Sequence, residues 1–114
     1  MIAVIFEGQP GPERGRDYLD LAAELRPLLD GIDGFISIER FASLTHEGKL
    51  LSLSFWRDEA AVTAWRGLGP HRAAQARGRG GVFESYRIRV ANVLRDYTAE
   101  ERAQAPADSR TANG

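Results

Sequence analysis

The chain has 114 residues, of which 43% are apolar, and carries fifteen basic against sixteen acidic residues. This length predicts one domain with a single core, and the nearly balanced charge gives no general field that would attract nucleic acid or an anionic membrane. The absence of cysteine excludes disulfides and thiolate chemistry, and two histidines that are 25 residues apart, His46 and His71, predict no transition-metal site.

The first predicted strand covers residues 2–7, an apolar and β-branched segment that ends at Glu7. It is followed by two prolines and two glycines within residues 8–12, which predict a loop. The apolar N-terminus is too short for the core of a signal peptide and lacks a basic segment before it. No run of the sequence approaches the length needed to cross a membrane, and we therefore expect a cytoplasmic protein.

A helix is predicted over about residues 16–29, because its apolar residues recur at spacings of three and four. These residues are Tyr18, Leu21, Ala22, Leu25, Leu28 and Leu29. Pro27 lies inside the pattern and is expected to bend the last turn, and Gly31 or Gly34 can end the helix.

Two strands are predicted next, over residues 35–41 and 50–56, joined by a polar connector that contains Gly48. Alternation places Leu51, Leu53 and Phe55 on one face of the second strand. In the strand over residues 35–41, alternation places Phe35 and Phe41 together on one face of that strand. The pair is expected to form an antiparallel hairpin.

Two tryptophans, nine residues apart, mark a strand that runs into a helix. Trp56 closes the apolar run of the strand, Asp58 is a typical N-cap, and Trp65 lies two turns into the second predicted helix. Large rings at these two positions can surround one cavity beside a sheet. The sequence therefore predicts a pocket between the sheet and the helices.

The last strand is predicted over residues 82–94, after a break at residues 67–70 and a short helix from His71 to about Gly78. Residues 98–114 contain almost no large apolar side chain and are expected to form a disordered C-terminal tail, which leaves residues 1–97 as the domain. The order is βαββαβ, an α+β, ferredoxin-like arrangement with a four-stranded antiparallel sheet and both helices on one face. The other face would be apolar, and we expect a homodimer to cover it.

Two stretches, residues 51–66 (LSLSFWRDEAAVTAWR) and 71–75 (HRAAQ), resemble the antibiotic biosynthesis monooxygenase family. Gly34-Phe35 and the segment from Phe83 to Tyr86 add to this resemblance, which spans roughly residues 2–97. It implies a dimeric α/β barrel of ferredoxin-like protomers, each with a pocket between sheet and helices. Members oxidise polycyclic phenols to quinones with oxygen, using neither metal nor flavin, whereas relatives degrade haem or only bind ligands.

The resemblance assigns Trp65 to the family's pocket tryptophan. The quinone-forming members have an asparagine one helical turn before this tryptophan and a tyrosine six residues after it, where this chain has Ala61 and His71. The haem-degrading members have an axial histidine ten residues after the tryptophan, where this chain has Gln75, and an asparagine on the first strand, where it has Phe6 or Glu7. Haem degradation is therefore disfavoured, and no cofactor is expected.

Oxidation of a phenol without a cofactor requires a base that generates an electron-rich phenolate inside a dry, apolar cavity. His71 is the candidate base or oxyanion partner, and Tyr86 is a candidate for orienting a substrate oxygen. With Trp65, these residues form the predicted catalytic set. We assign substrate binding to three aromatic residues, Trp56, Phe6 and Phe83.

The leading hypothesis is a dimeric, cofactor-independent monooxygenase that oxidises an aromatic or polyketide-like phenol. The alternative from another class is a non-catalytic dimer that binds a small aromatic or apolar ligand in the same cavity, which is favoured if neither His71 nor Tyr86 points inward. A haem-degrading monooxygenase is the third hypothesis.

Overall fold

The structure is a computed structural model that describes residues 1–11, 14–68 and 83–114. In chain order its elements are β1 (Ile2–Pro10), α1 (Gly15–Leu29), β2 (Phe35–Ala42), β3 (Leu50–Trp56), α2 (Glu59–Gly67), β4 (Phe83–Asn92) and α4 (Ala107–Asn113). The predicted strands, and both helices of the ferredoxin-like order, are found within a few residues of their expected bounds. The predicted short helix from His71 lies outside the described residues.

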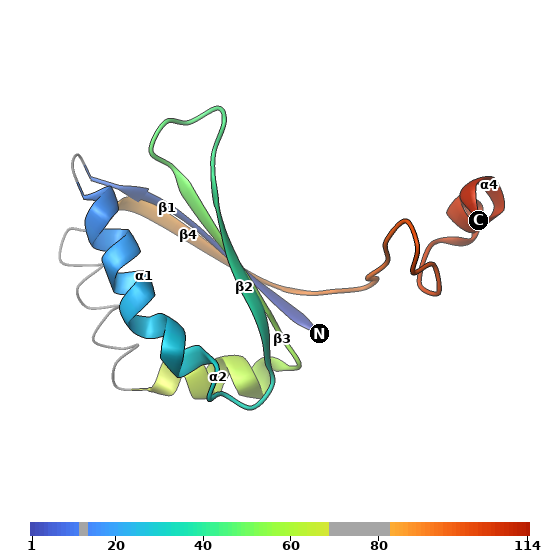
Figure 1. Cartoon of the computed structure of the whole chain (residues 1–114), viewed down its shortest axis with the longest axis horizontal. Helices are drawn as coiled ribbons and strands as arrows, with labels where there is room; N and C mark the ends of the chain where they lie inside the picture. Colours follow the sequence, from blue (N-terminus) through green and yellow to red (C-terminus); the bar gives the residue numbers. More distant parts are fainter. Residues whose placement is uncertain (12–13, 69–82) are drawn as a thin grey trace.

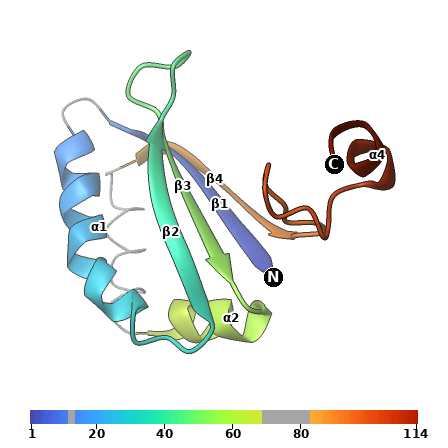
Figure 2. The same ribbon diagram turned by 45° about the vertical axis from the view of Figure 1, so that its right-hand side comes forward.

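The strands form one antiparallel sheet in the order β2-β3-β1-β4. Helices α1 and α2 cover one face of this sheet, and the segment that follows β4 leads away from them to α4 (Figures 1 and 2). The ferredoxin-like fold class is therefore confirmed.

Register places every second side chain of each strand toward the helices. Two successive rows cross the whole sheet on this face: Arg40, Ser52, Phe6 and Ile88 in one row, and Ile38, Ser54, Val4 and Val90 in the next. Four different strands therefore contribute to one continuous surface under α1.

The expected position of Phe35 is wrong. The pairing of β2 with β3 shifts register between Phe35 and Ser37, and an extra residue of this kind turns the side chains before it to the other face. The Phe35 ring consequently lies on the helix side, with its centroid 5.2 Å from that of Trp56. Phe41 remains on the open face, where it pairs with Leu51.

The tightest packing lies where α2 meets the sheet and the end of α1. Its buried residues are Leu29, Trp56, Ala61, Val62 and Trp65. Helix α1 continues through Pro27 to Leu29, and this brings the last turn into the cluster. The core therefore closes one end of the space between the sheet and the helices.

The start of α2 is fixed by polar contacts to the turn before β2. The Asp58 side chain caps the helix by accepting a hydrogen bond from Ala61 N at 2.9 Å. The Arg57 guanidinium donates two bonds of 3.1 Å to the Asp33 carboxylate, and Arg57 N donates to Gly34 O at 2.7 Å. Gly34 has a φ of +92°, a conformation that favours glycine. These contacts set the position from which α2 presents Trp65.

The segment after β4 contains α4, which is not among the predicted elements. The Arg102 side chain donates to Gly114 O at 2.7 Å and to Ser109 Oγ at 2.6 Å, and its guanidinium lies over the Tyr97 ring. Polar contacts around one arginine thus organise a segment that has little apolar surface to bury. The expected mobility of residues 98–114 stays a prediction.

Candidate functional site

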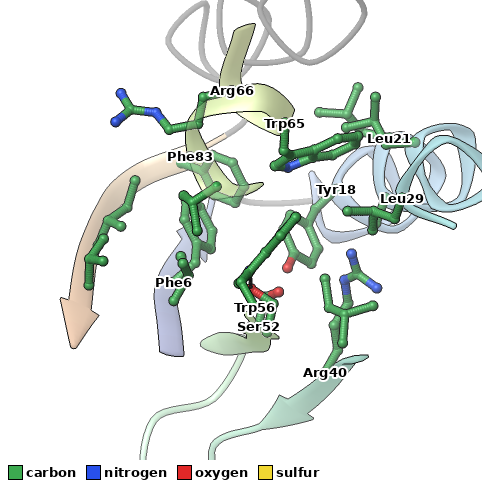
Figure 3. Close-up of a pocket in the computed structure, with 18 residues that line it drawn as sticks. Phe6, Tyr18, Leu21, Leu29, Arg40, Ser52, Trp56, Trp65, Arg66 and Phe83 are labelled. Carbon is green, nitrogen blue, oxygen red and sulfur yellow. Dashed lines mark hydrogen bonds between the residues drawn. The ribbon is translucent and has the colours of Figure 1, made fainter. Parts of the chain in front are cut away.

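A cavity of about 420 Å³ lies between the helix-facing side of the sheet and the helices α1 and α2 (Figure 3). Helix α1 approaches the sheet closely at few points, so the space beneath it is not filled by backbone packing. The α1 stripe of Tyr18, Leu21, Ala22, Leu25 and Leu29 forms the roof. The cavity has the size typical of small-molecule sites in proteins.

The floor of the cavity is hollow because β3 has two serines where large apolar side chains would fill the space. Ser52 and Ser54 both face the helices and line the cavity. Ser54 is buried, and its hydroxyl oxygen accepts a hydrogen bond of 2.9 Å from Trp56 Nε1. The indole N–H of Trp56 is thereby satisfied within the protein, and the ring presents an apolar surface to the cavity.

One end of the cavity is walled by aromatic rings. The Phe6 centroid lies 6.3 Å from that of Tyr18 in a stacked arrangement and 5.2 Å from that of Phe83 in an edge contact. Gly8 makes room for this group, since a Cβ atom at Gly8 would lie only 2.8 Å from the Phe6 ring and 2.9 Å from the Phe83 ring. Aromatic walls of this kind suit a flat or cyclic ligand.

The opposite end is walled by the two indole rings. Their centroids are 6.4 Å apart, and the planes of Trp56 and Trp65 are inclined by 32°. Trp65 is only 9% exposed and comes from α2, whereas Trp56 comes from the end of β3. The predicted pocket between a strand tryptophan and a helix tryptophan is present in the structure.

Two arginines are the only charged residues among the described residues that line the cavity. Arg40 rises from β2, and its guanidinium lies between the sheet and α1, whereas the Arg66 side chain extends from α2 away from the aromatic rings (Figure 3). No acidic side chain of the described chain lines the cavity. The rest of the lining that the described residues form is apolar apart from the hydroxyl groups of tyrosine and serine.

Five of the six predicted site residues lie within the described chain. The structure brings Trp65, Trp56, Phe6 and Phe83 together as lining residues of one cavity. Tyr86 is not part of the lining; it stacks on Phe6 with centroids 5.9 Å apart and is 46% exposed. His71 lies outside the described residues. The roles assigned to all six residues stay predictions.

Sequence reasoning missed the polar residues of the described lining, among them Arg40, Ser52 and Tyr18. Arg40 could have been found, because alternation places it on the same strand face as Ile38, and a charged residue on an apolar face is an informative exception. Tyr18 was predicted only as part of the buried stripe of α1. Ser52 carried no signal of its own, because serine is common in strands that face water.

The perturbed titratable groups of the described residues lie away from the cavity. The pKa of Asp33 is lowered by the hydrogen bonds and positive charge of Arg57. The pKa of Asp58 is lowered by its bond from the Ala61 N–H and then by Arg57. Because these residues hold the start of α2, their perturbed pKa values reflect a structural network.

Within the described ranges, no group of three or more histidine or acidic side chains is arranged to hold a metal ion. Among the helices of the same residues, none combines the length and the apolar character needed to cross a lipid bilayer.

Comparison with known sequences gives a family match over most of the chain. Residues 1–77 match the family model described as antibiotic biosynthesis monooxygenase. The chain is 48% identical over 101 residues to a protein of Pyricularia oryzae named jasmonate monooxygenase ABM, which covers 89% of this chain and 47% of that protein. It is 31% identical over 99 residues to the uncharacterised protein YqjZ of Bacillus subtilis, covering 87% and 84% of the two chains. The chain thus spans about half the length of the Pyricularia relative.

Solved structures show the same fold. The structure of Rv0793 from Mycobacterium tuberculosis superposes with a TM-score of 0.76 at 20% identity, covering 85% of this chain and 98% of that one. A conserved protein of Methanosarcina mazei Go1 superposes with a TM-score of 0.72 at 18% identity, covering 80% and 90%. At these identities the likeness concerns the fold, while the family model and the sequence relatives establish kinship: the chain belongs to the antibiotic biosynthesis monooxygenase family.

Proposed function

We propose that the protein is a monooxygenase that oxidises a small, mainly apolar substrate in the cavity between the sheet and α1. The observation that carries this proposal is the cavity itself, with aromatic walls at both ends and a nearly apolar lining, in a chain of the monooxygenase family. An apolar lining of this kind excludes water from reactive intermediates.

The first candidate substrate is an electron-rich phenol of the anthrone type. Its phenolate passes one electron to oxygen, and the resulting radicals combine at the ring carbon. One oxygen atom becomes the new carbonyl, and the other leaves as water with the two hydrogens of the oxidised CH₂ group. The substrate itself supplies all the electrons, so that the reaction balances without a cofactor.

Within this proposal the aromatic walls hold the substrate, and His71 acts at its oxygen. Trp56 and Trp65 offer ring surfaces on one side, while Phe6 and Phe83 do so on the other. The assignment of proton abstraction to His71 rests on the sequence alone. Replacing His71 with alanine is expected to abolish oxygen-dependent turnover, and equal rates in the variant and the wild type would refute the assignment.

Jasmonate is a second candidate substrate, because the relative at 48% identity carries that name. Jasmonate lacks an electron-rich phenol, and inserting one oxygen atom into a C–H bond while the other becomes water consumes two more electrons. This reaction would therefore need an added two-electron reductant. The requirement separates the two candidates experimentally.

We also propose that the protein is a homodimer that pairs through the open face of the sheet. Leu51, Leu53, Phe55 and Phe41 lie on this face, opposite the helices. Phe41 is 43% exposed in the single chain. The same face also carries charged residues such as Glu39 and Arg89, and apolar side chains beside charged ones are typical of a protein interface.

Oxygen uptake and isotope incorporation test the proposed reaction. The purified protein is incubated with 1,8-dihydroxyanthrone, or with jasmonate and a reductant, under ¹⁸O₂. We expect faster uptake than in protein-free buffer and one labelled oxygen atom in the product. If neither substrate is consumed, although a ligand still binds saturably, the non-catalytic alternative holds. A Soret shift on titration with haem, followed by loss of haem under a reductant, would favour haem degradation instead.

A further inference from the structure

We propose that Arg40 binds a carboxylate, and that the protein's ligand is a compact apolar molecule with one carboxylate group at the end that faces β2. This inference rests on the proposed function, in that a small molecule occupies the cavity. It adds the charge and the orientation of that molecule.

Arg40 is half-buried, and it is unusual among the arginines of the described chain because one nitrogen of its guanidinium group is withdrawn from water without a partner among the described residues. Its Nε atom is buried and has no hydrogen-bond partner in the described part of the chain. No ion pair with Arg40 is found among the described residues, whereas Arg14, Arg16, Arg26, Arg57 and Arg89 each pair with a carboxylate. Arg40 lines the cavity, and its guanidinium lies next to Leu29 at the end of α1 in Figure 3.

A buried donor of a permanently charged group is costly when it has no acceptor. Arginine cannot lower this cost by losing its proton, and the described residues provide no acceptor for Nε, so we infer that a ligand provides one. The lining of the cavity offers no acidic side chain among the described residues. A ligand that brings its own negative charge would satisfy the guanidinium and complete the site.

The planar fork of a guanidinium matches a carboxylate, because two parallel N–H groups bind its two oxygens. Ser52 lies directly opposite Arg40 in the register of β2 and β3, and its hydroxyl is a further donor on the same floor. The next position across the sheet is Phe6. The cavity therefore presents the positive charge of Arg40 at the edge formed by β2 and apolar surface near Phe6.

The other cavity arginine does not offer the same arrangement. The Arg66 side chain is exposed and points away from the rings, where water already solvates it (Figure 3). Arg40 is consequently the group that distinguishes a charged ligand from a neutral one. A cavity of about 420 Å³ accommodates a ligand of one or two rings with a short acidic chain.

Isothermal titration calorimetry at pH 7 tests this inference with a matched pair of probes, 4-phenylbutyrate and its uncharged amide, 4-phenylbutanamide. We expect the wild type to bind the acid at least about tenfold more tightly than the amide, as for a hydrogen-bonded charge pair. Arg40→Met is expected to remove this preference while it retains binding of the amide. Arg40→Lys is expected to keep part of this preference, because lysine conserves the positive charge but lacks the two parallel N–H groups of the guanidinium.

Arg16→Met is the control, since it removes one positive charge from a side chain that is 86% exposed on α1. It should leave the preference for the acid unchanged. The inference is overturned if wild type binds acid and amide equally or binds neither, if Arg40→Met keeps the preference, or if Arg16→Met loses it as fully. If Arg40→Met does not fold, the affinities of the wild type and of Arg40→Lys for the acid and the amide still test whether Arg40 binds the carboxylate. Calorimetry measures binding and not turnover. The result of this experiment therefore does not depend on whether the protein oxidises a substrate.

Discussion

The indole N–H of Trp56 donates to Ser54 Oγ at 2.9 Å, across two positions on the same face of β3. Ser54 therefore does two things for the cavity. Its small side chain leaves space on the floor, and its oxygen holds the large ring beside that space. A longer apolar residue at position 54 would fill the space and leave the indole nitrogen without an acceptor.

Ser54→Ala is expected to destabilise the protein by about 1–3 kcal/mol, because it leaves a buried indole N–H without a partner. The free energy of unfolding in urea measures this effect. Ser52→Ala is the matched control on the same strand face, since no hydrogen bond within the described chain involves the Ser52 side chain. A loss of equal size in both variants would show that the Trp56 bond is not the cause.

Trp65→Ala is expected to cost about 3 kcal/mol in the free energy of unfolding, because the ring is 9% exposed and packs within the buried cluster. The same measurement in urea checks it. Trp65→Phe keeps an aromatic ring and should lose less. A change below about 0.5 kcal/mol in the alanine variant would place the ring outside the stabilising core.

Gly34→Ala is expected to destabilise the fold by about 1–2 kcal/mol or more, because the position has a φ of +92° and a new Cβ atom would lie 2.8 Å from Ala61 Cβ. The thermal midpoint gives a direct comparison with Gly15→Ala, where an added Cβ meets nothing within 4 Å. Equal midpoints for the two variants would mean that the turn before β2 adapts without strain.

Acid is expected to weaken the anchoring of α2. The pKa values of Asp33 and Asp58 are held below their ordinary range in the folded protein. Their contribution to stability is therefore present above the unfolded pKa, near pH 4, and is lost as the pH falls through the folded pKa. Replacing both residues with asparagine should reduce the drop in thermal midpoint between pH 5 and pH 3. An unchanged drop would assign the acid sensitivity to other carboxylates.

Much of the fold could be predicted because local patterns and long-range pairing agree. The tryptophan that ends β3 and the Asp58 cap each act within a few residues, and the structure places both as expected. The apolar stripe of α1 is also found, except that Leu28 is 38% exposed because Leu29 takes the buried position in the last turn. Phe35 was misplaced because one register shift in β2 reverses which face a side chain occupies, and nothing in the alternation of the sequence marks such a shift.

The cavity was predictable in kind but not in its polar details. Aromatic residues at strand and helix ends indicate a pocket. The role of Arg40 in ligand binding, in contrast, depends on which residues lie opposite it. Only register shows that Ser52 is its neighbour across the sheet and that no described carboxylate reaches it. Similarly, α4 depends on contacts of Arg102 with residues up to twelve positions away, which hydrophobic periodicity does not reveal.

Phe41→Glu is expected to convert the proposed homodimer into a monomer without unfolding it. The ring is 43% exposed in the single chain, so a charge there costs little in the monomer and would be buried without a partner in the paired sheets. Sedimentation velocity measures the oligomeric state, and circular dichroism checks the fold. Leu44→Glu is the control, because this side chain is fully exposed in the hairpin loop. A dimer that persists in Phe41→Glu, or a wild type that sediments as a monomer at micromolar concentration, contradicts pairing through the open face.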